Sequence, residues 1–100
     1  MSTVPVYAFA KWQVKDGELA TVLSLLEQVA QESRKEKGNL LYKVHQSISD
    51  VNAIHLYEGY VDAVAAEEHR NSDHFQNIVI KTIIPLLSNR EVVMTKLLSE

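Results

Sequence analysis

Apolar residues occupy every second position from Val4 to Val14, which predicts a β-strand near the start of the chain. The apolar positions of this segment are Val4, Val6, Ala8, Ala10, Trp12 and Val14. Because successive side chains of a strand point to opposite faces of a sheet, a strict period of two gives this strand one fully apolar face.

The spacing then changes to three and four residues, which predicts an amphipathic helix. Its apolar positions are Leu19, Val22, Leu23, Leu26, Val29 and Ala30. Asp16 is expected to cap the start of this helix by accepting backbone N–H bonds. The helix is expected to end near Gly38, because glycine readily adopts the left-handed conformation found at helix ends.

A period of two returns after Gly38 and predicts a β-hairpin. The apolar face of its first strand would hold Leu40, Tyr42, Val44 and Ile48. A polar turn over residues 49–52 leads into a strand whose corresponding positions are Ile54, Leu56, Glu58 and Tyr60. Matching the two apolar faces places His45 opposite His55 or one pair away, on the other face of the sheet.

The remaining pattern predicts two helices and a closing strand. Asp62 is expected to cap a short helix over residues 63–69, and a further helix carries apolar residues at helical spacing from Phe75 to Leu86. Pro85 should kink or end that helix near residue 84. The segment from Glu91 to Leu98 is rich in Val, Met, Thr and Leu and is typical of a strand.

The element order is therefore β-α-β-β-α-β, which predicts an α+β, ferredoxin-like fold: a four-stranded antiparallel sheet with its helices on one face. The opposite face would be open. Tyr7, Phe9 and Leu41 fall in the phase of that open face. Since large apolar groups on an exposed sheet usually mark a contact with another chain, we expect a homodimer packed through its sheets.

Composition narrows the class of protein. A chain of 100 residues fits one domain, spanning 1–100, and no apolar run is long enough for a membrane span. There is no cysteine, and the first residues lack the pattern of a secretory signal, so the expected location is the cytoplasm. The net charge of −3 and the scattered basic residues argue against a nucleic-acid partner.

Candidate chemistry is concentrated in the second half of the chain. Glu58 lies in the apolar phase of its strand, so its carboxylate is either a structural hydrogen-bond acceptor or a tuned functional group. His69 and His74 flank a helix break close to Glu58 in the predicted fold. A neutral imidazole oriented by a carboxylate can take a proton from a phenol or enol. The alternative is that both histidines only stabilise helix ends.

The sequence predicts neither a metal nor another cofactor. His69 and His74 are five residues apart across a break, not i and i+4 on one helix, and neither a cysteine nor a second acid stands at ligand spacing. There is no glycine-rich phosphate loop, dinucleotide fingerprint or nucleophile elbow.

Several groups of residues together resemble the antibiotic biosynthesis monooxygenase (ABM) family over nearly the whole chain. They are Trp12 to Gly17, Ser33-Arg34 with Glu36 and Gly38, Tyr42 and His45, Tyr57 to Asp62, and His69 with Ser72 to Phe75. They resemble the small quinol monooxygenases of the family. The segments Gly38-Asn39-Leu40 and Leu56 to Tyr60 also resemble the branch that processes the phosphorylated autoinducer-2 signal.

This resemblance implies a dimeric α+β barrel and, for some members, oxygenation of phenols or quinols without flavin, haem or metal. It implies His69 and His74 as candidate bases, Glu58 as the group that orients them, and an aromatic substrate pocket walled by Tyr60, Trp12, Tyr42 and Phe75. Two departures matter. Tyr60 stands where many members carry Trp, and the axial histidine of the haem-degrading branch would fall at Val79.

Three functions are therefore carried forward. The first is a cofactor-free monooxygenase acting on a small quinol or polyphenol. The second is an isomerase of a small phosphorylated keto or sugar signal, which would also need a cation; Lys11, Lys43, Lys81 and Arg34 are available. The third is a non-catalytic dimeric module that binds a small molecule.

Overall fold

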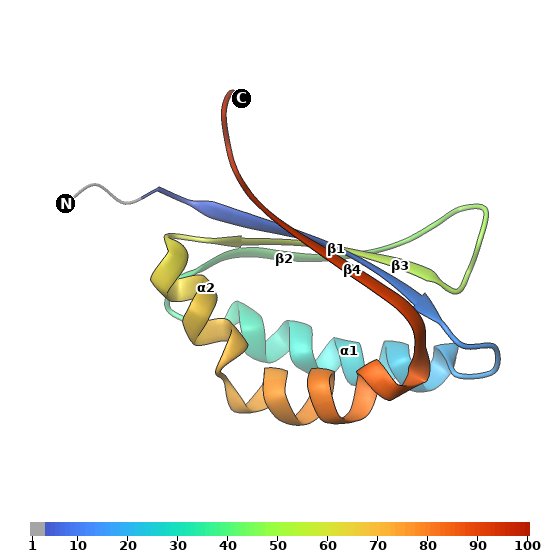
Figure 1. Cartoon of the computed structure of the whole chain (residues 1–100). Coiled ribbons are helices and arrows are strands. Elements are labelled where there is room, and N and C mark those ends of the chain that lie inside the picture. Colours follow the sequence, from blue (N-terminus) through green and yellow to red (C-terminus); the bar gives the residue numbers. More distant parts are fainter. Residues whose placement is uncertain (1–3) are drawn as a thin grey trace.

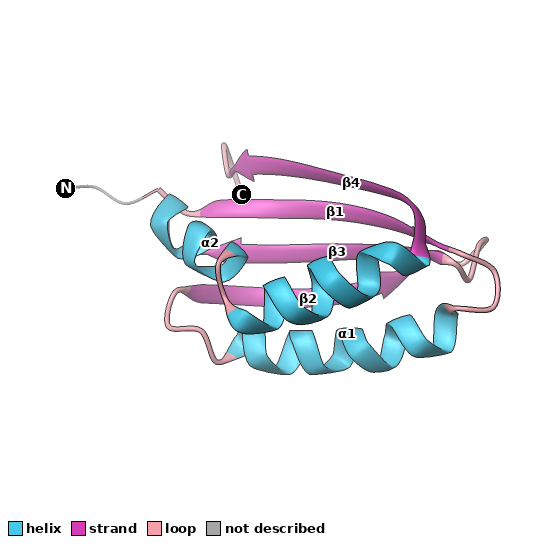
Figure 2. Cartoon of the chain, turned by 60° about the horizontal axis from the view of Figure 1, so that its bottom comes forward, coloured by secondary structure: helices cyan, strands magenta, loops and turns pink. Residues whose placement is uncertain are grey.

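The computed structural model describes residues 4–100, and the first three residues of the expected domain lie outside the described part. One antiparallel sheet with the strand order β2-β3-β1-β4 carries all the helices on one face (Figures 1 and 2). The elements follow the order β-α-β-β-α-β, with the second helical region divided into short segments. The predicted ferredoxin-like fold is confirmed. None of the helices in residues 4–100 is long and apolar enough to cross a membrane.

β1 (Val6–Val14) is a central strand with the alternation that the sequence predicted. It pairs with β3 (Ala53–Tyr60) on one side and with β4 (Leu87–Lys96) on the other. Ala8, Ala10, Trp12 and Val14 are buried beneath the helices. The apolar residues at every second position of β1 therefore form part of the sheet face that the helices cover.

α1 (Leu19–Arg34) buries one face against the sheet, with Val22, Leu26, Val29 and Ala30 among its buried residues. The predicted cap was wrong. Glu18 occupies the N-cap position and makes no side-chain cap bond, whereas Asp16 accepts a hydrogen bond from the Asn52 side chain. Gly17, with φ of 86°, turns the chain between Asp16 and the helix.

Gly38 has a different role from the one predicted. The helix ends at Arg34, and Gly17 is the glycine that adopts a positive φ in the described chain. A Cβ atom on Gly38 would lie 2.4 Å from the Cβ atom of Ala65 in α2 (Ala63–Arg70). Glycine is needed here because the loop between α1 and β2 packs directly against α2.

The hairpin of β2 (Asn39–Gln46) and β3 has the predicted register, with His45 directly opposite His55. The apolar face predicted for β2 is only partly correct. Tyr42 is buried, but Leu40, Val44 and Ile48 are exposed. β2 lies at the edge of the sheet, its pairing shifts between Asn39 and Leu41, and the strand ends before Ile48.

Asp62 caps α2 as predicted, since its side chain accepts a hydrogen bond from the backbone N–H of Ala65 at 2.8 Å. The next helical region is a π-helix, η1 (Phe75–Ile83), followed by a 3-10 turn, η2 (Ile84–Leu86), at Pro85. The change near residue 84 was predicted, whereas the π-helical form was not. β4 begins at Leu87, four residues before the predicted start at Glu91.

The opposite face of the sheet carries a cluster of aromatic rings. The ring of Tyr57 stacks on Phe9, with centroids 4.8 Å apart, and on Tyr7 at 5.9 Å. Phe9 is 47% exposed. The predicted open apolar face is therefore present, and the expected dimer through it stays a prediction.

Candidate active site

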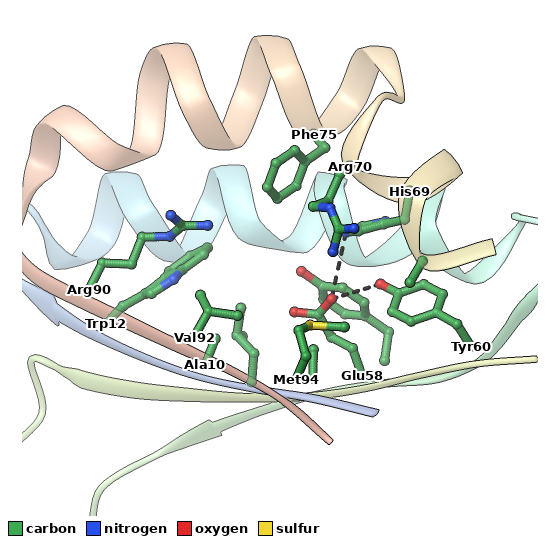
Figure 3. Close-up of a pocket in the computed structure, with 14 residues that line it drawn as sticks. Ala10, Trp12, Glu58, Tyr60, His69, Arg70, Phe75, Arg90, Val92 and Met94 are labelled. Carbon is green, nitrogen blue, oxygen red and sulfur yellow. Dashed lines mark hydrogen bonds and ion pairs between the residues drawn. The ribbon is translucent and has the colours of Figure 1, made fainter. Parts of the chain in front are cut away.

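A small cavity lies between the sheet and the helices, with a volume of about 50 Å³ (Figure 3). Its floor consists of inward-facing residues of β1, β3 and β4, and α2 and the start of η1 cover it. The lining residues used below are Ala8, Ala10, Trp12, Tyr42, Glu58, Tyr60, His69, Arg70, Phe75, Arg90, Val92 and Met94. A polar group set in a mainly apolar enclosure is typical of a small-molecule site.

The cavity exists because the central strand has small residues beneath it. Ala8 lies between Glu58 of β3 and Met94 of β4, and Ala10 lies between Leu56 and Val92. Trp12 follows on the same face and closes one end. Two alanines in the middle of a strand flanked by larger side chains therefore leave a hollow that the helices do not fill.

Glu58 and Tyr60 form the polar end of the cavity. Tyr60 donates a hydrogen bond from its hydroxyl to Glu58 Oε1 over 2.7 Å, and both residues are buried. Burial raises the pKa of Glu58, although the bond from Tyr60 and the nearby His69 oppose this effect. Burial also raises the pKa of Tyr60 and of Tyr42, with Glu58 adding to both, so these phenols stay protonated.

His69 lies between two carboxylates. Its Nδ1 is 2.8 Å from Glu36 Oε2. Its Nε2 is 3.6 Å from Glu58 Oε1, the contact that Figure 3 shows. A carboxylate only accepts hydrogen bonds, so the Nδ1 atom carries the proton in this contact. In neutral His69 the lone pair is then on Nε2, which is buried and makes no hydrogen bond within residues 4–100. That arrangement leaves a basic nitrogen at the polar end of the cavity.

Glu36 also contacts His74, whose Nε2 lies 2.5 Å from the same Oε2 atom. His74 does not line the cavity, and its ring lies next to that of His69, with the centroids 5.9 Å apart. The sequence analysis missed Glu36 as a site residue. Its position in the loop between α1 and β2 gave no local signal, since 33 residues separate it from His69. Only the packing of that loop on α2, at Gly38, brings it to the histidines.

No metal was predicted because neither a cysteine nor a second acid stands at ligand spacing from the two histidines, but the fold brings Glu36 to both of them. Glu36, His69 and His74 offer ligand atoms within 4.8 Å of one another, which is a donor set that divalent transition metals accept. In this structure the carboxylate oxygen instead receives hydrogen bonds from both rings. The prediction of a metal-free site stays a prediction.

Two arginines at the cavity were also missed. Arg70 reaches in from α2, and Arg90 from β4, where it is directly opposite Trp12 in the sheet (Figure 3). None of the four cations predicted for an anionic substrate lines the cavity. Lys11 and Lys43 occupy strand positions that alternate toward the opposite face of the sheet. The Arg34 side chain donates a hydrogen bond to the backbone oxygen of Tyr42.

The structure thus gathers six of the seven predicted site residues around one cavity: Glu58, His69, Tyr60, Trp12, Tyr42 and Phe75. His74 does not line the cavity but contacts Glu36 and lies with its ring 5.9 Å from that of His69, centroid to centroid. The predicted orienting contact also differs, because Glu36 rather than Glu58 holds the Nδ1 side of His69.

The fold belongs to the ferredoxin-like α+β class. Comparison with known proteins identifies the family. Residues 5–80 match the family model described as antibiotic biosynthesis monooxygenase. The chain belongs to the ABM family, whose named members include monooxygenases.

Individual relatives agree with this assignment. The Mycobacterium tuberculosis protein named "Putative monooxygenase Rv0793" is 29% identical over 75 residues, covering 75% of this chain and 73% of the relative. Its solved structure superposes with a TM-score of 0.90 at 26% identity, over 96% of this chain and 97% of that one. The structure of PA3566 from Pseudomonas aeruginosa also gives a TM-score of 0.90, at 25% identity and 99% coverage of both chains.

Proposed function

We propose that this protein is a monooxygenase that oxidises a small quinol or polyphenol with dioxygen and needs no bound cofactor. The observation that carries the proposal is the unpartnered Nε2 of His69 beside the cavity, on a ring whose Nδ1 is held by Glu36. A base in that setting is prepared to take a proton from a bound hydroxyl group.

The substrate hydroxyl fits between His69 and Glu58. The gap of 3.6 Å between Nε2 and Oε1 is too long for a hydrogen bond, but an oxygen atom placed beside it can reach both. His69 accepts the hydroxyl proton. Burial raises the pKa of Glu58 and so shifts this carboxyl toward its protonated form. A protonated Glu58 would donate a hydrogen bond to the resulting oxyanion. Arg70 and Arg90 add positive charge at the same cavity.

The deprotonated ring is electron-rich and transfers one electron to dioxygen. The ring radical and superoxide then combine at a ring carbon, and loss of water from the hydroperoxide leaves a carbonyl group. One oxygen atom enters the product and the other leaves as water, so the hydroxyarene is oxidised to a quinone by one dioxygen. The protein supplies the base, the geometry and an enclosure poor in water.

The test is oxygen consumption with a panel of naphthohydroquinones, with autoxidation subtracted. The protein is first dialysed against a chelator, so that any turnover is independent of loosely held metal. We expect one dioxygen consumed for each hydroxynaphthoquinone formed, with one oxygen atom in the product and no hydrogen peroxide released. If wild-type protein gives no turnover above the autoxidation background, the oxygenase proposal fails for these substrates.

The two arginines favour a second candidate, an isomerase of a small phosphorylated keto or sugar compound of the autoinducer-2 type. The same base would move a proton between carbons, and a guanidinium group would bind the phosphate. This reaction consumes no oxygen, so proton NMR of the substrate in deuterated water separates it from the oxygenase. A protein that binds such ligands but turns over neither class would be the non-catalytic module.

A further inference from the structure

A second, wider groove adjoins the cavity on its α2 and β4 side. It has a volume of about 400 Å³ and is lined by Val6, Ala63, Ala66, Arg70, Met94, Thr95 and Lys96. Ala66, Arg70 and Met94 also line the inner cavity. The two spaces therefore share a boundary, and a ligand seated at His69 can extend past Met94 into the groove.

The inner cavity alone is small for a two-ring substrate, since binding sites for such ligands usually measure about 300–1,000 Å³. Its volume of about 50 Å³ accommodates the reacting hydroxyl and part of a ring. The rest of a larger substrate has to lie toward the groove, whose residues thereby contact whatever group the ring carries.

The groove has a positive lining. Arg70 stands on its α2 side, and Lys96 on its β4 side, directly opposite Val6 of β1. No acidic residue is among its lining residues within the described chain. Glu67 pairs with Arg70, but their side chains are 59% and 45% exposed, and exposed pairs of this kind are weak and easily shared with another anion.

We propose that this groove is a subsite for an anionic substituent of the substrate, such as a carboxylate or a phosphate, bound by Arg70 and Lys96. The proposal rests on the proposed function only for the orientation of the ligand, with its hydroxyl at His69. A guanidinium binds either anion through two parallel N–H bonds, and an ammonium adds a point charge. The substrate class becomes an aromatic or keto compound that carries one negative group beyond the reacting centre.

Binding without turnover tests the subsite directly. The chain has a single tryptophan, Trp12, which lines the inner cavity, so its indole N–H signal in a proton–nitrogen NMR spectrum reports occupancy. The probes are 2-naphthoate, 1-naphthyl phosphate and the uncharged 2-naphthamide. We expect at least one of the two anions to bind about tenfold or more tighter than the amide, and the preference to shrink as salt is added. The anion that binds more tightly indicates whether the natural group is a carboxylate or a phosphate.

Substitutions show which residues cause the preference for anions over the amide. Arg70→Met and Lys96→Met should each reduce the ratio of anion affinity to amide affinity several-fold, and Arg70→Lys should keep part of that ratio. Lys96, which lines only the groove, should leave the affinity for the amide unchanged when replaced by Met. Lys43→Met is the matched control, because Lys43 lies in the phase of the opposite sheet face. Equal affinities for anions and amide in wild type would overturn the subsite, as would an unchanged preference in both Met variants. Oxygen consumption is measured separately, so an anion preference without turnover would leave the subsite standing and reject the oxygenase.

Discussion

His69 Nδ1 and Glu36 Oε2 lie 2.8 Å apart, although 33 positions separate the two residues in the sequence. This contact fixes which nitrogen of His69 carries the proton, and so makes the cavity-side nitrogen the basic one. Glu36 does not line the cavity. It acts through His69 and is therefore a positioning residue in the proposed reaction.

Glu36→Gln should therefore lower kcat with little change in KM. Glu36 Oε2 receives both rings in the structure, and an uncharged amide oxygen is a weaker acceptor than this carboxylate, so the Nδ1 proton of His69 is held less firmly. We expect kcat to fall by roughly 100-fold, the scale of general base catalysis, in a steady-state oxygen assay. Glu32→Gln, an exposed position on α1, is the control. Wild-type kcat in Glu36→Gln would show that Glu36 is only structural.

The two histidines should differ in their effect. His69→Gln removes the only cavity-side imidazole among residues 4–100 and should lower kcat by about 10²–10⁴-fold. His74→Gln removes a ring that contacts Glu36 and neighbours His69 but does not line the cavity, and we expect less than about a tenfold loss. Both variants are assayed on the same quinol, with circular dichroism as the folding control. The opposite ranking would identify His74 as the base.

Glu58 should make stability depend on pH. Burial raises its pKa in the folded state above the ordinary value of 4.5, so the folded protein holds this proton more tightly than the unfolded chain. The associated stability is fully present below pH 4.5 and is lost as the pH rises through the folded pKa. Glu58→Gln, which has no charge to bury, should therefore gain stability relative to wild type across that range. Urea unfolding at a series of pH values measures the difference.

The matched control for this titration is Glu68→Gln, on the exposed side of α2. Its stability relative to wild type should not follow the same pH dependence. A difference between Glu58→Gln and wild type that stays constant with pH would contradict the raised pKa.

The close contact between Gly38 and Ala65 is testable by a double-mutant cycle. Gly38→Ala would place a Cβ atom 2.4 Å from Ala65 Cβ, and overpacking of this kind typically costs about 1–3 kcal/mol in the free energy of unfolding. Adding Ala65→Gly removes the clash, so the double variant should recover a substantial part of the loss. Additive effects of the two substitutions would mean that the contact is relieved by loop movement. Thermal or urea unfolding provides the measurement.

The exposed aromatic face should mediate dimer formation. Phe9→Lys places a charge beside the ring of Tyr57 and should convert a dimer into a monomer in size-exclusion chromatography with light scattering. Val64→Lys, which changes an exposed apolar residue on the helix side, is the control and should stay dimeric. A wild-type protein that is monomeric at all concentrations would reject the dimer.

The sequence was sufficient for the fold because its main signals are periodic and local. The alternation around Trp12 and the matching phases of the hairpin determine which side chains face inward, and they also predicted the pairing of His45 with His55. The predictions were wrong at positions where contacts between distant elements determine the local structure. Gly38 is required by a helix that passes above it, and the exposed side chains of β2 follow from its position at the sheet edge.

The candidate site was predictable only in part, for the same reason. Glu58 was predicted because its carboxylate occupies a strand position that otherwise carries apolar residues on that face. Glu36, Arg70 and Arg90 are ordinary charged residues in their own segments. Only the packing of distant elements brings Glu36 to His69 and the two arginines to the cavity. The alternation along β4 is a sequence signal for part of the site, because it places Arg90 and Lys96 on the same face as Trp12 and Val6.

The position of β1 between β3 and β4 also has a consequence for how the protein is made. β1 emerges from the ribosome first, yet both of its partners follow tens of residues later, and β4 comes last. Folding that depends on such distant pairings is slow compared with local helix formation. Arg90, Val92 and Met94 belong to this strand, so a nascent chain has no complete cavity until β4 has been made. The protein therefore gains its binding site and its completed sheet in the same step.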